Sequence, residues 1–260
     1  MAHKVKMLGT GNAFLPNGRL HSLVLIDDKY LVDAPPTALI SLRNNGIPVN
    51  TIETIFITHL HGDHIFGLPF LFLERQYISD RDGDSPLNII AAPGAKKRIT
   101  DICNLAYPGT LERFLPQITW IEDEKGVIDD WSWERFRVHH DDSVDPFGYR
   151  FESSDGASLV HSGDSGPCET LYQAIGRSQL GVVEMGFPEW VDSDHHHKPS
   201  DIQKLSEMFP STKLVITHTY IDDKHSKFPK ITESKFPHHP DNVHHASDGD
   251  EFFWDGGIWK

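Results

Sequence analysis

Three histidines and one aspartate stand within six positions of the segment IFITHLHGDHIFGLP. The apolar residues before them predict a buried β-strand over 51–61, with this polar cluster at its carboxyl end. Because side chains two residues apart share a face of a strand, we expect His59 and His61 to point at one ion. Asp63 and His64 follow where the chain turns and are placed for a second ion. Imidazole and carboxylate suit zinc, and also manganese or iron in a more open site, so the spacing predicts a metal centre.

Strand and helix patterns alternate on both sides of this cluster. In the first half, strand patterns surround predicted helices over 35–46 and 64–78. In the second half, strands such as FGYRFES, LGVVEMGF and KLVITHTY alternate with the helical CETLYQAIGRS and SDIQKLSEMF. Interleaved strands and helices in each half suggest two sheets packed together with helices outside. The chain's 260 residues are ample for one large core.

Composition narrows the classes of function. The formal net charge is −14, which disfavours a large nucleic acid as substrate, because non-specific nucleic-acid binding depends on positive charge. No apolar run reaches the roughly 18 residues of a membrane-spanning helix, and no signal peptide is evident. The two cysteines, Cys103 and Cys168, give no disulfide framework. We therefore expect a cytoplasmic protein with no membrane partner.

Three segments carry a resemblance to a known family. THLHGDHIFGLP resembles the signature of the metallo-β-lactamase superfamily, and specifically of its ribonuclease Z-like branch. LGTGNAFLPNGRLHSLVL is similar to the opening strand and loop of that branch, and LVDAPPTALISL to the strand and helix that follow. The likeness runs from Val5 to about Trp254. It implies an α/β fold, the four-layered αββα sandwich, with residues 1–260 as a single hydrolase domain.

The same resemblance implies two divalent metal ions, zinc in the first place, with manganese or iron as alternatives. The implied ligands are His59, His61 and His140 for one ion, Asp63, His64 and His218 for the other, and Asp164 as a bridge. In FRVHHDD the family pattern favours His140, and its neighbour His139 stays an alternative. Two such ions about 3.5–4 Å apart can share a water, lower its pKa and clamp an in-line displacement.

A glutamate–histidine pair is also implied by the resemblance. Glu184 ends the strand pattern LGVVEMGF, and its partner lies in DHHHKPSD, where His196 is favoured and His197 stays open. In the family this pair stabilises the phosphoryl centre or protonates the leaving oxygen. We therefore expect Asp63, Glu184 and His196 to be the catalytic residues. Asp33, after YLV, is expected to be a hydrogen-bonding group near the site, not a ligand.

The chain departs from the ribonuclease Z pattern in one respect. Only 23 residues separate His140 from Asp164, which leaves no room for the arm that grips transfer RNA in that family. The main hypothesis is a phosphodiesterase that uses metal-bound hydroxide on a small cyclic or linear phosphate diester. The alternatives are a lactone, ester or β-lactam hydrolase on the same metals, a ribonuclease Z-like endonuclease, and a non-catalytic metal-bearing binding module. The resemblance allows a homodimer, and the lysine-containing segment 221–242 is a candidate lid.

Overall fold

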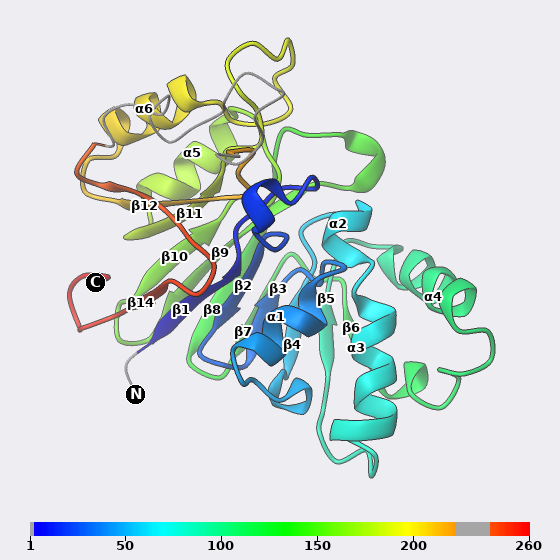
Figure 1. Cartoon of the computed structure of the whole chain (residues 1–260). Coiled ribbons are helices and arrows are strands. Elements are labelled where there is room, and N and C mark those ends of the chain that lie inside the picture. Colours follow the sequence, from blue (N-terminus) through cyan, green and yellow to red (C-terminus); the bar gives the residue numbers. More distant parts are fainter. Residues whose placement is uncertain (1–2, 222–239) are drawn as a thin grey trace.

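Two β-sheets lie face to face at the centre of the computed structural model, which describes residues 3–221 and 240–260 (Figure 1). The first sheet has the strand order β14-β1-β2-β3-β4-β5-β6. Its strands are β1 (Lys4–Gly9), β2 (Leu23–Ile26), β3 (Tyr30–Val32), β4 (Thr54–Phe56), β5 (Asn88–Ile90), β6 (Thr119–Ile121) and β14 (Glu251–Phe253). The last strand of the chain thus completes the first sheet, pairing antiparallel with β1.

The second sheet has the order β13-β12-β11-β10-β9-β8-β7. Its strands are β7 (Lys125–Ile128), β8 (Trp131–Arg137), β9 (Phe147–Ser153), β10 (Ser158–His161), β11 (Leu180–Glu184), β12 (Lys213–Thr217) and β13 (Val243–His245). Strands β10, β11 and β12 run parallel, so their carboxyl ends meet at one edge of the sheet.

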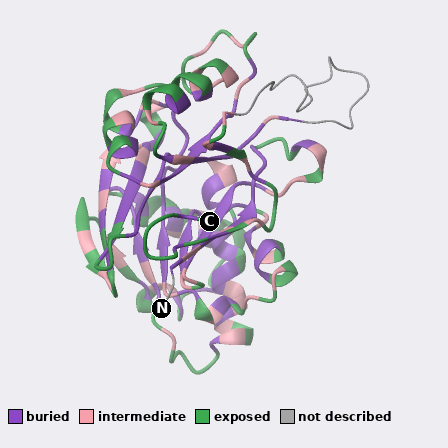
Figure 2. Ribbon diagram, turned by 90° about the vertical axis from the view of Figure 1, so that its left-hand side faces the viewer, coloured by how far each residue is buried: buried purple, intermediate pink, exposed green. Residues whose placement is uncertain are grey.

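Helices cover the outer faces of both sheets. They are α1 (Ala38–Asn44), α2 (Gly62–Ile65), α3 (Leu68–Glu74), α4 (Ala95–Ala106), α5 (Glu169–Gly176) and α6 (Pro199–Met208). Leu42, Leu71 and Ile99 from α1, α3 and α4 join one buried apolar cluster with the first sheet. Ile175 and Leu205 from α5 and α6 join another with the second sheet. The predicted αββα order of layers is therefore confirmed (Figures 1 and 2).

The inner faces of the sheets form a third apolar cluster, which includes several aromatic residues. Phe56, the last residue of β4, packs edge-on against Trp133, Tyr149 and Phe151 of the second sheet, at centroid distances of 5.8, 5.2 and 4.9 Å. Edge-to-face aromatic pairs of this kind each add about 0.5–1.5 kcal/mol beyond the area they bury. The chain therefore leaves β4 from a point that both sheets hold fixed.

Two local predictions around the histidine cluster were wrong. The strand predicted over 51–61 ends at Phe56, so the rule that alternate strand residues share a face does not apply to His59 and His61. The helix predicted over 64–78 is broken into α2 and α3 near Gly67. The backbone passes so close to Pro35 there that a Cβ on Gly67 would lie 2.0 Å from the Pro35 carbonyl oxygen. That contact, and the hydrogen bond from Gly67 N–H to the Ala34 carbonyl, hold the chain in the break.

The short connection between His140 and Asp164 holds no projecting arm, as predicted. After a single 3₁₀ turn, Asp142–Val144, it consists of the hairpin of β9 and β10, with no projecting arm. Among the described residues, no helix is both long and apolar enough to cross a membrane. Most of the predicted lid over 221–242, including Lys224, Lys227, Lys230 and Lys235, lies outside the described residues.

Candidate metal centre

Loops at one edge of the sandwich bring the predicted ligands together. His59 and His61 follow β4, His140 follows β8, Asp164 follows β10 and His218 follows β12. The carboxyl ends of strands are the usual mounting point for ligands in sheets of this kind. His218 has a φ of 48°, a left-handed conformation that turns the chain off β12 directly into the site.

The loop that carries His59 and His61 is irregular, but both sheets brace it. The Ile57 N–H donates to the Ile90 carbonyl of the first sheet. On the other side, the Phe147 N–H donates to the Thr58 carbonyl, and the Leu60 N–H donates to the Val144 carbonyl. The Tyr149 hydroxyl also donates to the Ile57 carbonyl. These hydrogen bonds fix the backbone that carries His59 and His61, although it is a loop and not the predicted strand.

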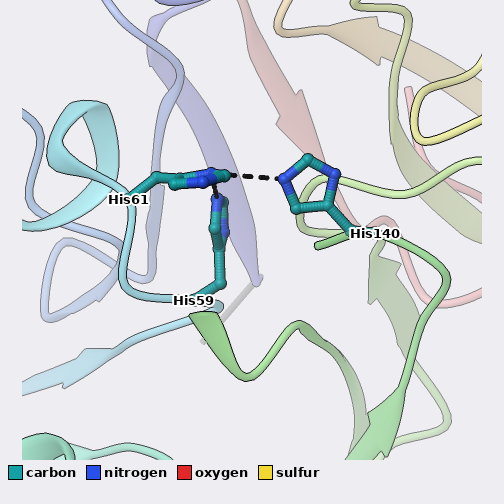
Figure 3. Close-up of side chains that lie close together, drawn as sticks. All are labelled: His59, His61 and His140. Atoms are coloured by element: carbon teal, nitrogen blue, oxygen red, sulfur yellow. Dashed lines mark hydrogen bonds between the residues drawn. The ribbon is translucent and has the colours of Figure 1, made fainter. Parts of the chain in front are cut away.

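Three imidazole rings converge in the first ligand cluster (Figure 3). His61 Nδ1 lies 3.1 Å from His59 Nε2 and 3.2 Å from His140 Nε2. His61 Nδ1 carries either one N–H or one lone pair, so it cannot make a full hydrogen bond with both of the other nitrogens. Ligand atoms about 2.0–2.1 Å from a tetrahedral zinc ion lie about 3.3 Å apart, so the observed spacing fits a shared metal ion.

The second cluster joins Asp63 and His64 of α2 to Asp164 and His218. His218 Nε2 lies 3.5 Å from Asp63 Oδ2, and His64 Nε2 lies 3.6 Å from the same oxygen. Asp164 faces both clusters: its Oδ1 is 3.4 Å from His64 Nε2, and its Oδ2 is 3.4 Å from His218 Nε2 and 3.7 Å from His59 Nε2. One carboxylate is thus placed between the two groups of ligands.

Hydrogen bonds on the outer side of the rings determine which nitrogen faces the centre. His64 Nδ1 lies 2.7 Å from Asp33 Oδ2, and His140 Nδ1 lies 3.0 Å from the His195 carbonyl, so both rings donate outward. His59 Nδ1 lies 3.0 Å from the Thr58 hydroxyl, which itself donates to Asp33. All three rings then turn Nε2 inward, and the buried Nε2 of His64 has no hydrogen-bond partner. This is the outer-partner arrangement typical of metal-binding histidines.

The charges of the centre suit a cation. Burial holds the pKa of His59 and His140 below the ordinary histidine value, which favours their neutral, metal-binding form. Burial opposes the charged form of Asp164, but His218 and His64 outweigh it and hold the pKa of that carboxyl well below its usual range. Burial also lowers the pKa of His64, yet Asp164 and Asp33 raise it well above the ordinary value. A bound cation would therefore compete with a proton for His64 Nε2. The donor set as a whole, imidazoles with carboxylates, fits zinc or a similar divalent ion.

The structure places only one histidine of each alternative pair in the centre. His140 points inward, whereas the neighbouring His139 turns outward, where its Nε2 meets Asp194 at 3.1 Å. His196 lies beside the ligands. His197 is buried away from them, and its Nδ1–H donates to the Ser165 carbonyl.

Glu184 and His196 are in contact next to the ligand clusters. Glu184 is fully buried, and its Oε1 accepts from His196 Nδ1 at 3.1 Å and from the backbone N–H groups of Ser165 and His197. The ring of His196 stacks parallel to that of His218 with centroids 5.7 Å apart. One donor atom of His196 also falls within 4.8 Å of those of His140 and Asp164. A buried carboxylate thus aims an imidazole at the centre.

Sequence reasoning missed two groups that shape the site. The Thr58 hydroxyl links Asp33 to His59, and the His195 carbonyl holds His140. Thr58 directly precedes His59, but nothing in the sequence shows that its hydroxyl faces the ring. Asp33 was expected as a hydrogen-bonding group, and this is confirmed: it accepts from both Thr58 and His64.

The fold and the donor set define a metal hydrolase of the metallo-β-lactamase fold. Two solved structures show the same fold. YhfI from Bacillus subtilis has a TM-score of 0.75 and 17% identity, and the match covers 97% of this chain and 99% of that one. The human short-form tRNase Z, ELAC1, has a TM-score of 0.72 and 20% identity, and the match covers 95% of this chain and 98% of that one.

Sequence comparison gives the family. The sequence model of the anti-Pycsar protein Apyc1 family matches residues 3–184, and the chain belongs to that family. It is also 34% identical over 223 residues to ribonuclease Z of Listeria innocua, covering 81% of this chain and 69% of the relative. The predicted membership of the ribonuclease Z-like branch of the metallo-β-lactamase superfamily is therefore confirmed.

Proposed function

We propose that this protein is a phosphodiesterase that hydrolyses a small cyclic or linear phosphate diester, using two divalent ions, preferably zinc. The observation that carries the proposal is the contact between Glu184 and His196 beside the ligand clusters. A positioned imidazole acid helps to expel an alkoxide from phosphorus, and the resemblance to the ribonuclease Z-like branch assigns that role to this pair. We further propose that residues 1–260 act as one hydrolase domain.

Each proposed role follows from a position in the site. His59, His61 and His140 would hold one ion, and Asp63, His64 and His218 the other, with Asp164 between them. When bound, the two ions would activate water and neutralise charge on the phosphoryl oxygens.

His196 would act as the proton donor to the leaving group. With Nδ1 bonded to Glu184, its Nε2 is the atom free to meet the leaving oxygen. Burial lowers the pKa of His196, but the charge of Glu184 outweighs burial and raises this pKa to about 9. At neutral pH both ring nitrogens therefore carry a proton. Because the carboxylate is fully buried and held by backbone N–H groups, it also fixes the orientation of the ring.

A small substrate is favoured by the surface and by the connection between the metal motifs. The formal net charge of −14 repels a polyphosphate backbone, and the β9–β10 hairpin leaves no arm for transfer RNA. The ribonuclease Z relatives keep one further candidate in view, an RNA endonuclease acting with a partner or in a dimer that supplies basic surface.

A substrate panel with matched variants tests the proposal. The panel contains an aryl phosphodiester, cyclic mononucleotides, a lactone, a β-lactam and a transfer-RNA precursor. We expect the phosphodiesters to be preferred, Asp63→Ala to abolish turnover, and His196→Ala to reduce it by about 10²–10⁴-fold while metal content is retained. His195→Ala, one position away and exposed, is the control for His196→Ala and should reduce turnover far less.

Other outcomes would favour the alternatives. Preference for a lactone or β-lactam, with no sensitivity to Glu184→Gln, would replace the phosphodiesterase by a carbonyl hydrolase. Precursor cleavage as the dominant activity would favour the endonuclease. Metal binding without turnover of any substrate would favour a binding module. Full phosphodiester turnover by metal-stripped protein would reject the proposed chemistry.

A further inference from the structure

A second group of metal-binding side chains lies outside the candidate centre. His139, Asp194 and His195 each offer a donor atom, and these atoms all fall within 4.8 Å of one another. His139 Nε2 lies 3.1 Å from Asp194 Oδ2, and the rings of His139 and His195 meet edge-on at 5.5 Å. The side chains of His139 and Asp194 are 42% and 78% exposed, so an ion can reach them from solvent.

Close backbone packing holds the two segments that carry these residues. The Gly166 N–H donates to the His139 carbonyl at 2.8 Å. On its other side, Gly166 is so near the second segment that a Cβ there would lie 1.5 Å from the Asp194 carbonyl oxygen. Only glycine permits this close approach. The packing brings two loop segments that are more than 50 residues apart in sequence within reach of one ion. The backbones that carry the three side chains are therefore held close to one another.

We propose that His139, Asp194 and His195 form a peripheral site for one zinc ion, separate from the central ligand set. Two imidazoles and one carboxylate are a zinc-type donor set, and three protein ligands leave coordination positions open to solvent. Because all three side chains are partly or largely exposed, this ion binds more weakly than those at the buried centre.

The peripheral site is connected to the centre through the backbone. The carbonyl of His195 accepts the hydrogen bond from His140 Nδ1, and the next residue along the chain is His196. An ion that joins His195 to His139 ties down the segment that orients one central ligand and carries the proposed proton donor. A zinc ion at the peripheral site would therefore restrain the segment that contains His195 and His196.

Metal counting on the loaded protein tests the site without any substrate. Protein saturated at the centre is equilibrated with increasing free zinc by dialysis, and bound zinc is measured by elemental analysis. Wild-type protein should bind one ion more than the Asp194→Asn and His139→Asn/His195→Asn variants. Changing outer partners of a metal ligand already alters affinity by about 10–100-fold, so loss of a ligand should weaken the extra site by at least about tenfold.

Asp192→Asn is the matched control, since it makes the same change of charge in the same loop at a residue outside the group. It should bind as much zinc as the wild type, and every variant should keep the central ions, which shows that it is folded. Equal zinc binding by wild type and Asp194→Asn would overturn the proposal and leave His139 and Asp194 as a simple ion pair. Because the readout is ion content, this result stands apart from any failure of the proposed phosphodiesterase activity.

Discussion

Replacing Asp33 by asparagine should weaken metal binding although Asp33 is not itself a ligand. Its carboxylate accepts from the Thr58 N–H and hydroxyl, both at 2.8 Å, and from His64 Nδ1 at 2.7 Å. Through Thr58 it also orients His59. One buried side chain thus positions a proposed ligand in each of the two clusters.

The size of the effect follows from counting donors. All three groups around Asp33 donate, whereas an asparagine amide offers one accepting oxygen and one NH₂ group. In either amide orientation, at least one donor therefore faces another donor. If His64 changes tautomer to accept from the amide, its Nε2 becomes protonated and cannot bind a cation. Loss of such outer partners costs about 10–100-fold in metal affinity, which corresponds to about 1.4–2.7 kcal/mol.

Asparagine is the right replacement because Asp33 has a φ of 69°, a left-handed conformation that asparagine tolerates better than alanine does. Asp28→Asn is the control: Asp28 has a φ of 59° and is exposed, with its carboxylate paired to Lys4. The assay is competition for zinc between metal-free protein and a chelator of known affinity. If Asp33→Asn binds zinc as tightly as Asp28→Asn does, the proposed orienting role is refuted.

Three further predictions concern the ligands and the proton donor. Glu184 raises the pKa of His196 to about 9 against the effect of burial, so kcat should fall as the pH rises through that region. Cations bound nearby would move this fall to a somewhat lower pH. Glu184→Gln should move this fall to lower pH in a pH–rate profile. Gly186→Ala should reduce kcat without metal loss, as kinetics and metal analysis can show, because its Cβ would lie 2.7 Å from His196 Nδ1. His140→Ala should lose a central ion and most turnover by metal analysis and kinetics, whereas His139→Ala should keep both central ions.

The layered fold could be predicted because its causes are local and repeated. Strand β8 places Trp131 and Trp133 inward and Ser132 outward, the period of two that a half-buried strand requires. The strand leading to His59 could not be bounded in the same way, since its residues stay apolar through Ile57. The Ile57 N–H still bonds to Ile90 of the first sheet, but from Thr58 onward the backbone bonds to Asp33 and to the second sheet, contacts between segments far apart in sequence.

Choosing between adjacent histidines also depended on tertiary contacts. His139 and His140 have the same chemistry, and side chains of neighbouring residues in extended chain point in opposite directions. Which one faces the centre depends on where the His195 carbonyl and Gly166 lie, and those belong to other loops. The resemblance favoured His140 and His196, and the structure brings both into the cluster, but their roles as ligand and proton donor stay predictions.

The charges at the centre give an independent reason to expect cations there. Asp33, Asp63 and Asp164 lie together with little exposure, and among residues 3–221 and 240–260 their ion-pair partners are histidines alone. Buried carboxylates are costly unless positive charge compensates them. Neutral imidazole cannot supply that charge, and a ring that supplies it by taking a second proton has no lone pair left for a metal ion. Two divalent ions would compensate all three while using the lone pairs that the outer hydrogen bonds turn inward. The same arrangement that makes the metal-free centre electrostatically unfavourable therefore makes it selective for cations.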